Sequence, residues 1–114
     1  MMEAYACQKY VRVSSKKLKR LAEPLKGKTV TEVEGILKLH SSLSSIPLFK
    51  AVHSAASNFK NKAGPDVSPQ NDLLVSNIKI DQGATFKRIN RRAMGRADIM
   101  RRRTSHITVT VKEK

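Results

Sequence analysis

Residues 74–111, LVSNIKIDQGATFKRINRRAMGRADIMRRRTSHITVTV, decide the fold of this chain, because two strand patterns flank a long segment with little apolar content. In each pattern apolar and polar residues alternate, which predicts antiparallel strands with one face covered by helices and the other in water. The expected inward residues are Leu74, Ile78 and Ile80 in the first strand and Ile107, Val109 and Val111 in the last. The expected outward residues are Asn77, Lys79 and Asp81, followed by His106, Thr108 and Thr110.

The segment between these strands, residues 83–104, predicts an extended basic arm. A connection of this length without a core of its own is unusual in a compact domain, so it is either disordered or ordered by a partner. Gly83 and Gly95 are isolated glycines in a segment that otherwise lacks linker composition, which favours the arm. If its two sides continue as strands of about 9 or 10 residues, the arm reaches roughly 30 Å beyond the sheet.

The first part of the chain predicts one more strand, at residues 4–11, and then a helix. Ser14 is the expected N-cap of this helix, and Gly27 is its expected end. Pro24 lies inside the helical pattern, where it should kink the helix or shorten its last turn.

Two further helices are predicted before the second strand. The second helix is expected to be short and to begin with a capping box formed by Thr31 and Glu34. A turn at Ser41–Ser45 precedes the third helix, which has Pro47 in its first turn and ends before a loop at residues 64–72. The expected inward residues of the three helices are Leu18, Leu21, Ala22 and Leu25; Val33, Ile36 and Leu37; and Leu48, Val52, Ala55, Ala56 and Phe59.

This order of elements predicts an α+β fold. Three helices pack on a small antiparallel three-stranded sheet, and a long basic β-hairpin protrudes from it. A length of 114 residues suits a single domain spanning residues 1–114, with residues 83–104 as the projecting arm.

Net charge is the strongest compositional feature. The formal charge is +14, from 23 Lys and Arg against 9 acids. Residues 12–28 hold seven cations and one acid, and residues 86–106 hold eight cations and one acid, so nearly all of the excess lies in two blocks. Such concentrated charge favours a polyanionic partner, because binding it relieves self-repulsion and releases counterions.

Both blocks have features of an RNA-binding surface. In the first, the cations fall away from the apolar stripe of the helix and only Glu23 offsets them. In the second, Arg outnumbers Lys seven to one, and planar guanidinium groups suit bidentate phosphate contacts and stacking on bases. The candidate RNA-binding residues are Arg12, Lys16, Lys17, Lys19, Arg20, Lys26, Lys28, Arg96, Arg101, Arg102, Arg103, Thr104, Ser105 and His106.

Catalysis and cofactor binding find little support. His40, His53 and His106 have no metal-ligand spacing, and Cys7 has no second cysteine with which to complete a zinc site. We expect Cys7 to be an inert buried thiol, and we expect neither a catalytic residue, a metal nor a cofactor. No stretch approaches transmembrane length, so no membrane partner is expected.

Two other classes of function fit this sequence less well than RNA binding. A DNA-architectural protein also inserts basic arms, into the minor groove, but such proteins usually dimerise through a larger apolar surface than this chain offers. A membrane-active cationic protein needs an amphipathic helix with a broad apolar face, whereas the first helix has a narrow stripe interrupted by Pro24.

Three groups of residues together resemble the large-subunit ribosomal protein family conventionally called L-twenty-two, in its bacterial or organellar form. The most specific group is Lys87-Arg88-Ile89, Arg92-Ala93, Gly95-Arg96-Ala97-Asp98 and Arg103-Thr104-Ser105-His106-Ile107-Thr108-Val109. The other two groups are Ser14, Lys17, Leu21-Ala22, Leu25 and Gly27-Lys28, and Ser54-Ala55 with Asn58. The resemblance covers essentially the whole chain in the right order.

The resemblance implies a structural constituent of the large ribosomal subunit, which binds large-subunit rRNA, supports its assembly and lines the nascent-peptide exit tunnel with its hairpin tip. The implied partners are rRNA, neighbouring ribosomal proteins and the nascent polypeptide, with macrolide antibiotics binding nearby. The implied location is the cytoplasmic ribosome, with an organelle-encoded origin left open. The implied tunnel-lining tip consists of Lys87, Arg88, Ile89, Asn90, Arg91 and Arg92.

The chain departs from the family pattern at three positions. Arg91 stands where the family commonly has Pro, which leaves the path of the tip open. Met94 replaces a basic residue and removes one expected phosphate contact. Pro24 replaces an aliphatic residue, which leaves the length of the first helix open.

Overall fold

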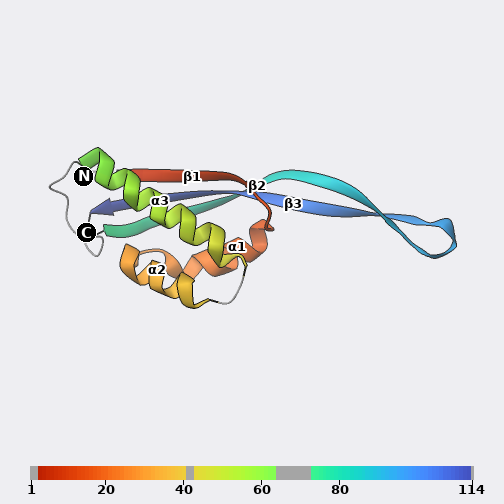
Figure 1. The fold of residues 1–114 in the computed structure, drawn as a ribbon, viewed down its shortest axis with the longest axis horizontal. Coiled ribbons are helices and arrows are strands. Elements are labelled where there is room, and N and C mark those ends of the chain that lie inside the picture. Colours follow the sequence, from red (N-terminus) through yellow and green to blue (C-terminus); the bar gives the residue numbers. More distant parts are fainter. Residues whose placement is uncertain (1–2, 41–42, 64–72, 114) are drawn as a thin grey trace.

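The computed structural model describes residues 3–40, 43–63 and 73–113. These residues form three α-helices, three strands and two short 3-10 turns, and the order β-α-α-α-β-β is the one expected (Figure 1). The elements are β1 (Glu3–Val11), α1 (Ser15–Ala22), a 3-10 turn (Glu23–Leu25), α2 (Val30–Leu39), α3 (Ser45–Ala63), β2 (Leu73–Arg91), a 3-10 turn (Ala93–Gly95) and β3 (Ala97–Glu113).

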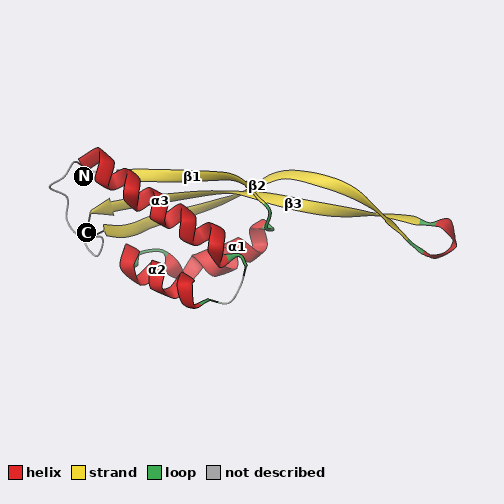
Figure 2. Ribbon diagram, viewed as in Figure 1, coloured by secondary structure: helices red, strands yellow, loops and turns green. Residues whose placement is uncertain are grey.

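The three strands form one antiparallel sheet in the order β1-β3-β2, and the helices lie on one side of it (Figure 2). Alternate residues of β3 point into the helix layer, which is why Ile107, Val109 and Val111 are all fully buried. The stripe predicted on α3, from Leu48 to Phe59, is fully buried as well. The α+β fold class and these two apolar faces are therefore confirmed.

The inward face of β2 differs from the prediction at its first residue. Leu73 and Val75 are fully buried, whereas Leu74, predicted to be inward, is half-buried. A β-bulge between Val75 and Asn77 adds one residue to β2. Because side chains alternate with a period of two, this added residue reverses the faces on either side of it, and the prediction for Leu74 was wrong.

The start of α2 lies two residues before the predicted position. Thr29, and not Thr31, is the N-cap, and its hydroxyl oxygen accepts a hydrogen bond of 3.3 Å from the backbone N–H of Glu32. Ile36 was predicted to be inward but is 37% exposed, because the buried face of α2 passes through Val30, Val33 and Leu37.

Pro24 shortens α1, as predicted. The α-helix ends at Ala22, and Pro24 lies in the 3-10 turn that follows, where its missing N–H leaves no donor unpaired. Ser14 is the N-cap by its extended backbone, although its side chain makes no capping hydrogen bond with any described residue. Gly27 adopts a φ of +83° and donates its backbone N–H to the carbonyl of Val75 at 2.9 Å, which ties the end of this segment to β2.

The C-terminal part of α3 is hydrogen-bonded to β1. Asn58 and Lys62 donate side-chain hydrogen bonds to the carbonyls of Tyr5 and Glu3, at 2.9 and 2.8 Å. The turn predicted before α3 is present at residues 43–44, and Ser45 already belongs to the helix. The loop predicted at residues 64–72 lies outside the described residues.

Candidate nucleic-acid interface

Strands β2 and β3 continue well past the helices as a two-stranded arm (Figure 1). The arm residues pair in antiparallel register from Thr85–Arg103 to Arg91–Ala97. The molecule measures 66 × 25 × 17 Å, and its radius of gyration of 17.3 Å exceeds the roughly 13 Å typical of a compact domain of this length. The protruding basic hairpin predicted from the sequence is therefore present.

The base of the arm is a tightly packed junction around Gly83. The register of β2 and β3 shifts between Gln82 and Thr85, and Gly83 lies within this bulge. A Cβ atom on Gly83 would lie 2.6 Å from Oγ1 of Thr104 and 3.1 Å from Cε1 of His106. Gly83 is therefore the position at which the side chains of β3 pack directly onto the backbone of β2.

We expect Gly83→Ala to lower the free energy of unfolding by about 1–3 kcal/mol, because the added methyl overpacks this junction. The measurement is denaturant unfolding followed by circular dichroism. Gly35→Ala is the matched control, because no described atom lies within 4 Å of its added Cβ. Since alanine is a better helix former than glycine, Gly35→Ala should stabilise the protein slightly. Equal effects of the two substitutions would contradict the account of the junction.

Thr104 and Ser105 do not contribute hydroxyl donors to an RNA-binding surface, and this prediction was wrong. Both residues are buried, with 3% and 0% of their surface exposed. Thr104 donates its hydroxyl proton to the carbonyl of Ala84, and Ser105 donates to the carbonyl of Val13, each at 2.6 Å. These hydrogen bonds hold β3 to β2 and to the segment before α1, so the two hydroxyls have a structural role.

The two faces of the arm differ in charge. Because residues paired across the strands share a face and alternate along them, one face carries cations without an acid. Its members are Lys87, Arg91, Arg101 and Arg103, with Ile89 opposite Ile99 between them. The other face carries Phe86, Arg88, Met100 and Arg102, with the Arg88 guanidinium carbon 6.0 Å from the centre of the Phe86 ring.

The two basic blocks meet where the arm leaves the body. One hollow of about 530 Å³ is lined by Lys17 of α1 together with Arg101 and Arg103 of β3. A second, of about 610 Å³, brings Arg12 beside Arg101, Arg102 and Arg103. Cations about 90 residues apart in sequence thus form one surface, which we call the basic junction (Arg12, Lys17, Arg101, Arg102 and Arg103).

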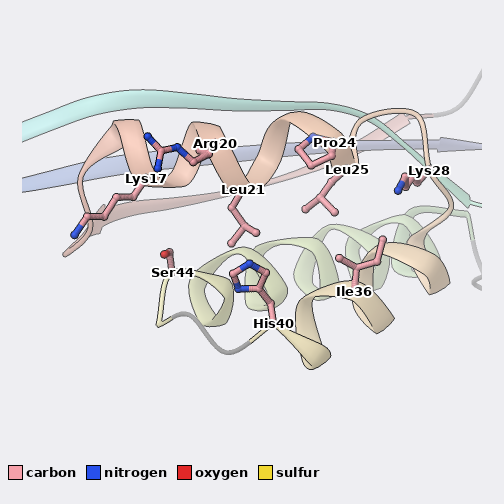
Figure 3. Close-up of a pocket in the computed structure, with 9 residues that line it drawn as sticks. All are labelled: Lys17, Arg20, Leu21, Pro24, Leu25, Lys28, Ile36, His40 and Ser44. Atoms are coloured by element: carbon pink, nitrogen blue, oxygen red, sulfur yellow. The ribbon is translucent and has the colours of Figure 1, made fainter.

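A third hollow extends this basic surface between α1 and α2 (Figure 3). Lys17, Arg20 and Lys28 contribute its cations. Leu21 and Leu25 extend from the first helical segment toward α2, which contributes Ile36. The groove therefore joins an apolar floor to a basic rim. The other predicted cations of this block, Lys16, Lys19 and Lys26, are exposed, and Lys26 lies 3.9 Å from Glu23.

The chain reverses direction four to five residues after the centre of the predicted tip. The turn spans residues 92–96, where Met94 and Gly95 have φ values of +62° and +75° and the N–H of Arg92 donates to the carbonyl of Arg96 at 2.7 Å. Of the predicted tip, Lys87 to Arg91 lie on β2, and Arg92 alone lies in the turn. Arg96, predicted to bind rRNA, is exposed on the far side of the same turn.

Asp98 forms an ion pair across this turn. Its carboxylate accepts a hydrogen bond of 2.7 Å from Nε of Arg92 and so joins the two sides of the tip. Met94 is almost fully exposed at the apex, at 99%. The end of the arm therefore presents a thioether beside a paired guanidinium.

The structure places Cys7 on β1 and His53 on α3. Cys7 is exposed on β1, which corrects the prediction of a buried thiol, since it occupies the outward face between the buried Ala6 and the half-buried Gln8. His53 pairs with Glu34 at 3.2 Å on the helical side. Among the residues that the structure describes, no group of His, Cys, Asp and Glu is arranged to hold a metal ion. No helix in the same residues has the length and apolar content needed to cross a membrane.

Comparison with known proteins gives a consistent result. The model of the family described as ribosomal protein L22p/L17e matches residues 6–112. The large ribosomal subunit protein uL22 of Maridesulfovibrio salexigens is 47% identical over 98% of this chain and 99% of that protein. The proteins of the same name from Pelotomaculum thermopropionicum and Thermoanaerobacter pseudethanolicus are 41% and 43% identical, over 99% of this chain and 97% and 99% of theirs. This chain, with its extended basic hairpin on a three-helix body, thus belongs to the ribosomal protein L22p/L17e family.

Proposed function

We propose that this chain binds large-subunit rRNA through the basic junction and the arm, and that it supports folding of the rRNA during subunit assembly. As a member of its family the chain is a structural constituent of the large ribosomal subunit, and it is not an enzyme. The observation that carries the proposal is the convergence of Arg12 and Lys17 with the three arginines of β3.

The physical basis of binding is neutralisation of phosphate charge by a surface of fixed shape. Like charges held this close repel one another in the free protein, and rRNA phosphates relieve that repulsion while releasing counterions. The arginines of the arm offer planar donors for phosphates and bases, and they stand on a paired two-stranded scaffold. A folded rRNA supplies the closely spaced phosphates that such a surface requires.

The distal arm has a second role in this proposal, as part of the wall of the nascent-peptide exit tunnel. Its length supports this role, since the paired strands carry the turn at residues 92–96 far from the helices. The implied neighbours there are rRNA, other ribosomal proteins and the nascent polypeptide. If the distal arm lines the tunnel, macrolide antibiotics bind near its tip. The same role places the chain on the ribosome.

Competition binding tests the rRNA proposal against the DNA-architectural alternative. The labelled chain is bound to large-subunit rRNA at 0.15 M salt and challenged with either unlabelled rRNA or duplex DNA of equal nucleotide content. We expect the rRNA to compete at much lower concentration, because its irregular folds match the basic junction. Equal or better competition by duplex DNA would contradict the proposal.

Shortening the arm tests the tunnel role. Removing Arg88 and Ile89 together with Ile99 and Met100 deletes two complete paired rows, which shortens the arm by about 7 Å and keeps the register of the remaining pairs. We expect this variant to change macrolide sensitivity or nascent-chain stalling more than subunit yield, because the basic junction is intact.

The measurements are antibiotic titration and polysome profiles of matched strains. Deleting Lys87 to Ile89 alone is a useful comparison, because it shortens only β2. Removing three residues from one strand moves the β2 side chains beyond the deletion to the opposite face of the arm. A loss of subunits without any change in antibiotic sensitivity or stalling would contradict the tunnel role.

A further inference from the structure

The face of the sheet opposite the helices carries two exposed tyrosines. On this face the outward residues of β1, β3 and β2 follow one another in rows, such as Tyr5, Thr110 and Asn77. Tyr5 and Tyr10 are 68% and 62% exposed. Exposed aromatic rings on an open sheet beside a cationic surface are an arrangement that RNA-binding domains use to stack unpaired bases.

Tyr10 is set apart from Tyr5 by its backbone. It lies in a bulge of β1 between Gln8 and Val11 and has a φ of +58°. A positive φ at a bulky residue costs of order 1–3 kcal/mol and persists only where the surroundings enforce it. Burial of Tyr10 does not account for this cost, because the residue is largely exposed.

His106 of β3 holds Tyr10 in this conformation. The backbone N–H of Tyr10 donates to Nδ1 of His106 at 3.2 Å, and the two rings meet edge to face with centroids 5.0 Å apart. Since Nδ1 accepts, the neutral imidazole carries its proton on Nε2, where it is a further donor. The imidazole in turn lies against Gly83, so the packed base of the arm supports the pair.

The pair adjoins the basic junction. Arg12 follows Tyr10 by two residues and shares a hollow with Arg101, Arg102 and Arg103. On β3, His106 lies four residues after Arg102, so alternation places these two side chains on the same face. The Tyr10 and His106 rings thus lie on the side of the sheet that carries Arg12 and Arg102 of the junction.

We infer that Tyr10 and His106 form a stacking platform for one unpaired base of the rRNA bound at the basic junction. The ligand class is a nucleotide in a single-stranded or bulged segment, because a duplex keeps its base faces covered. This inference rests on the proposed rRNA binding and adds to it a defined contact with a base.

Substitutions of Tyr10 distinguish the contribution of its ring to RNA binding from that of its backbone conformation. Tyr10→Gly removes the ring and also relieves the positive φ, so it should fold at least as well as the wild type. We expect it to bind large-subunit rRNA about 5- to 150-fold more weakly, the range for loss of one stacked base. The slope of log K against log salt should not change, since no phosphate contact is lost. Tyr10→Phe keeps the ring and should recover most of the affinity.

Tyr5→Ala is the matched control, because Tyr5 is equally exposed on the same face but lacks the histidine and the positive φ. Ultraviolet cross-linking of the wild-type protein to rRNA, read by mass spectrometry, gives a measure that needs no variant, and we expect a nucleotide adduct on the peptide containing Tyr10. Normal affinity of Tyr10→Gly with no such adduct would overturn the platform while leaving rRNA binding in place. An equal loss in Tyr5→Ala would also overturn it. Failure of the wild-type chain to bind rRNA would overturn both the platform and the proposed function.

Discussion

Replacing Arg101, Arg102 and Arg103 together with alanine is expected to weaken binding to large-subunit rRNA by roughly 100-fold at 0.15 M salt. All three side chains are exposed at the basic junction, where they line the same hollow as Arg12. Each phosphate contact adds about 0.7–0.9 to the slope of log K against log salt, so the slope should become less steep by about 2 to 3. The measurement is a salt titration of rRNA binding by the purified protein.

The control for this prediction removes the same charge elsewhere. Lys38, Lys50 and Lys60 lie on α2 and α3, outside the basic junction, and their triple replacement with alanine also lowers the net charge by three. We expect this control to retain most of the affinity and most of the slope. Equal losses in the two triple variants would mean that total charge, and not the junction, governs binding. In cells, the arginine variant should be under-represented in subunits when it competes with the wild type.

Replacing Phe59 with alanine is expected to lower the free energy of unfolding by about 3–5 kcal/mol. Phe59 is fully buried on α3, within the core that the helices form with the sheet. Its loss leaves a cavity that the surrounding side chains fill only partly, and the stability of a small domain is of order 5–15 kcal/mol. The melting temperature should fall by roughly 10–20 °C, measured by calorimetry or circular dichroism.

Leu39→Ala is the surface control for the core prediction. Leu39 is 90% exposed at the end of α2, so its truncation should change stability by no more than about 0.5 kcal/mol. A small effect of Phe59→Ala, similar to that of Leu39→Ala, would contradict the assignment of the core.

The features that could be predicted from the sequence are those that depend on local periodicity. Val109 and Phe59 follow from alternation in a strand and from a helical stripe, and the structure buries both. Pro24 ends α1 because its ring and missing N–H act within one turn of the helix. The arm followed from the charge and low apolar content of residues 83–104, which rule out a core of their own.

The predictions were wrong where contacts between residues distant in sequence determine the local structure. Thr29 and Thr31 are each followed three residues later by a glutamate, so both satisfy the capping-box pattern. Tertiary structure makes Thr29 the N-cap, because Thr29 forms an isolated β-bridge with Leu74. This bridge places Val30 in the core. The bulge that turns Leu74 away from the core likewise depends on pairing with β3, which a single strand does not reveal.

The candidate site shows the same limit. Ser105 was predicted to bind RNA, but the carbonyl that accepts its hydroxyl belongs to Val13, 92 residues away. Tyr10 was missed because neither its positive φ nor its contact with His106 has a sequence pattern. The candidate RNA-binding cations are exposed, except for the half-buried Lys28, because a charged group needs water or a partner.

Sedimentation most directly tests whether this chain is bound to the rRNA of the large ribosomal subunit. A lysate containing the tagged chain is separated on a sucrose gradient after a high-salt wash, with and without RNase, and the chain is detected across the fractions. We predict that the chain stays with the large subunit through the wash and is released when the rRNA is digested. A chain that remains at the top of the gradient, or that sediments with DNA, would contradict its assignment as an rRNA-bound component of the large subunit.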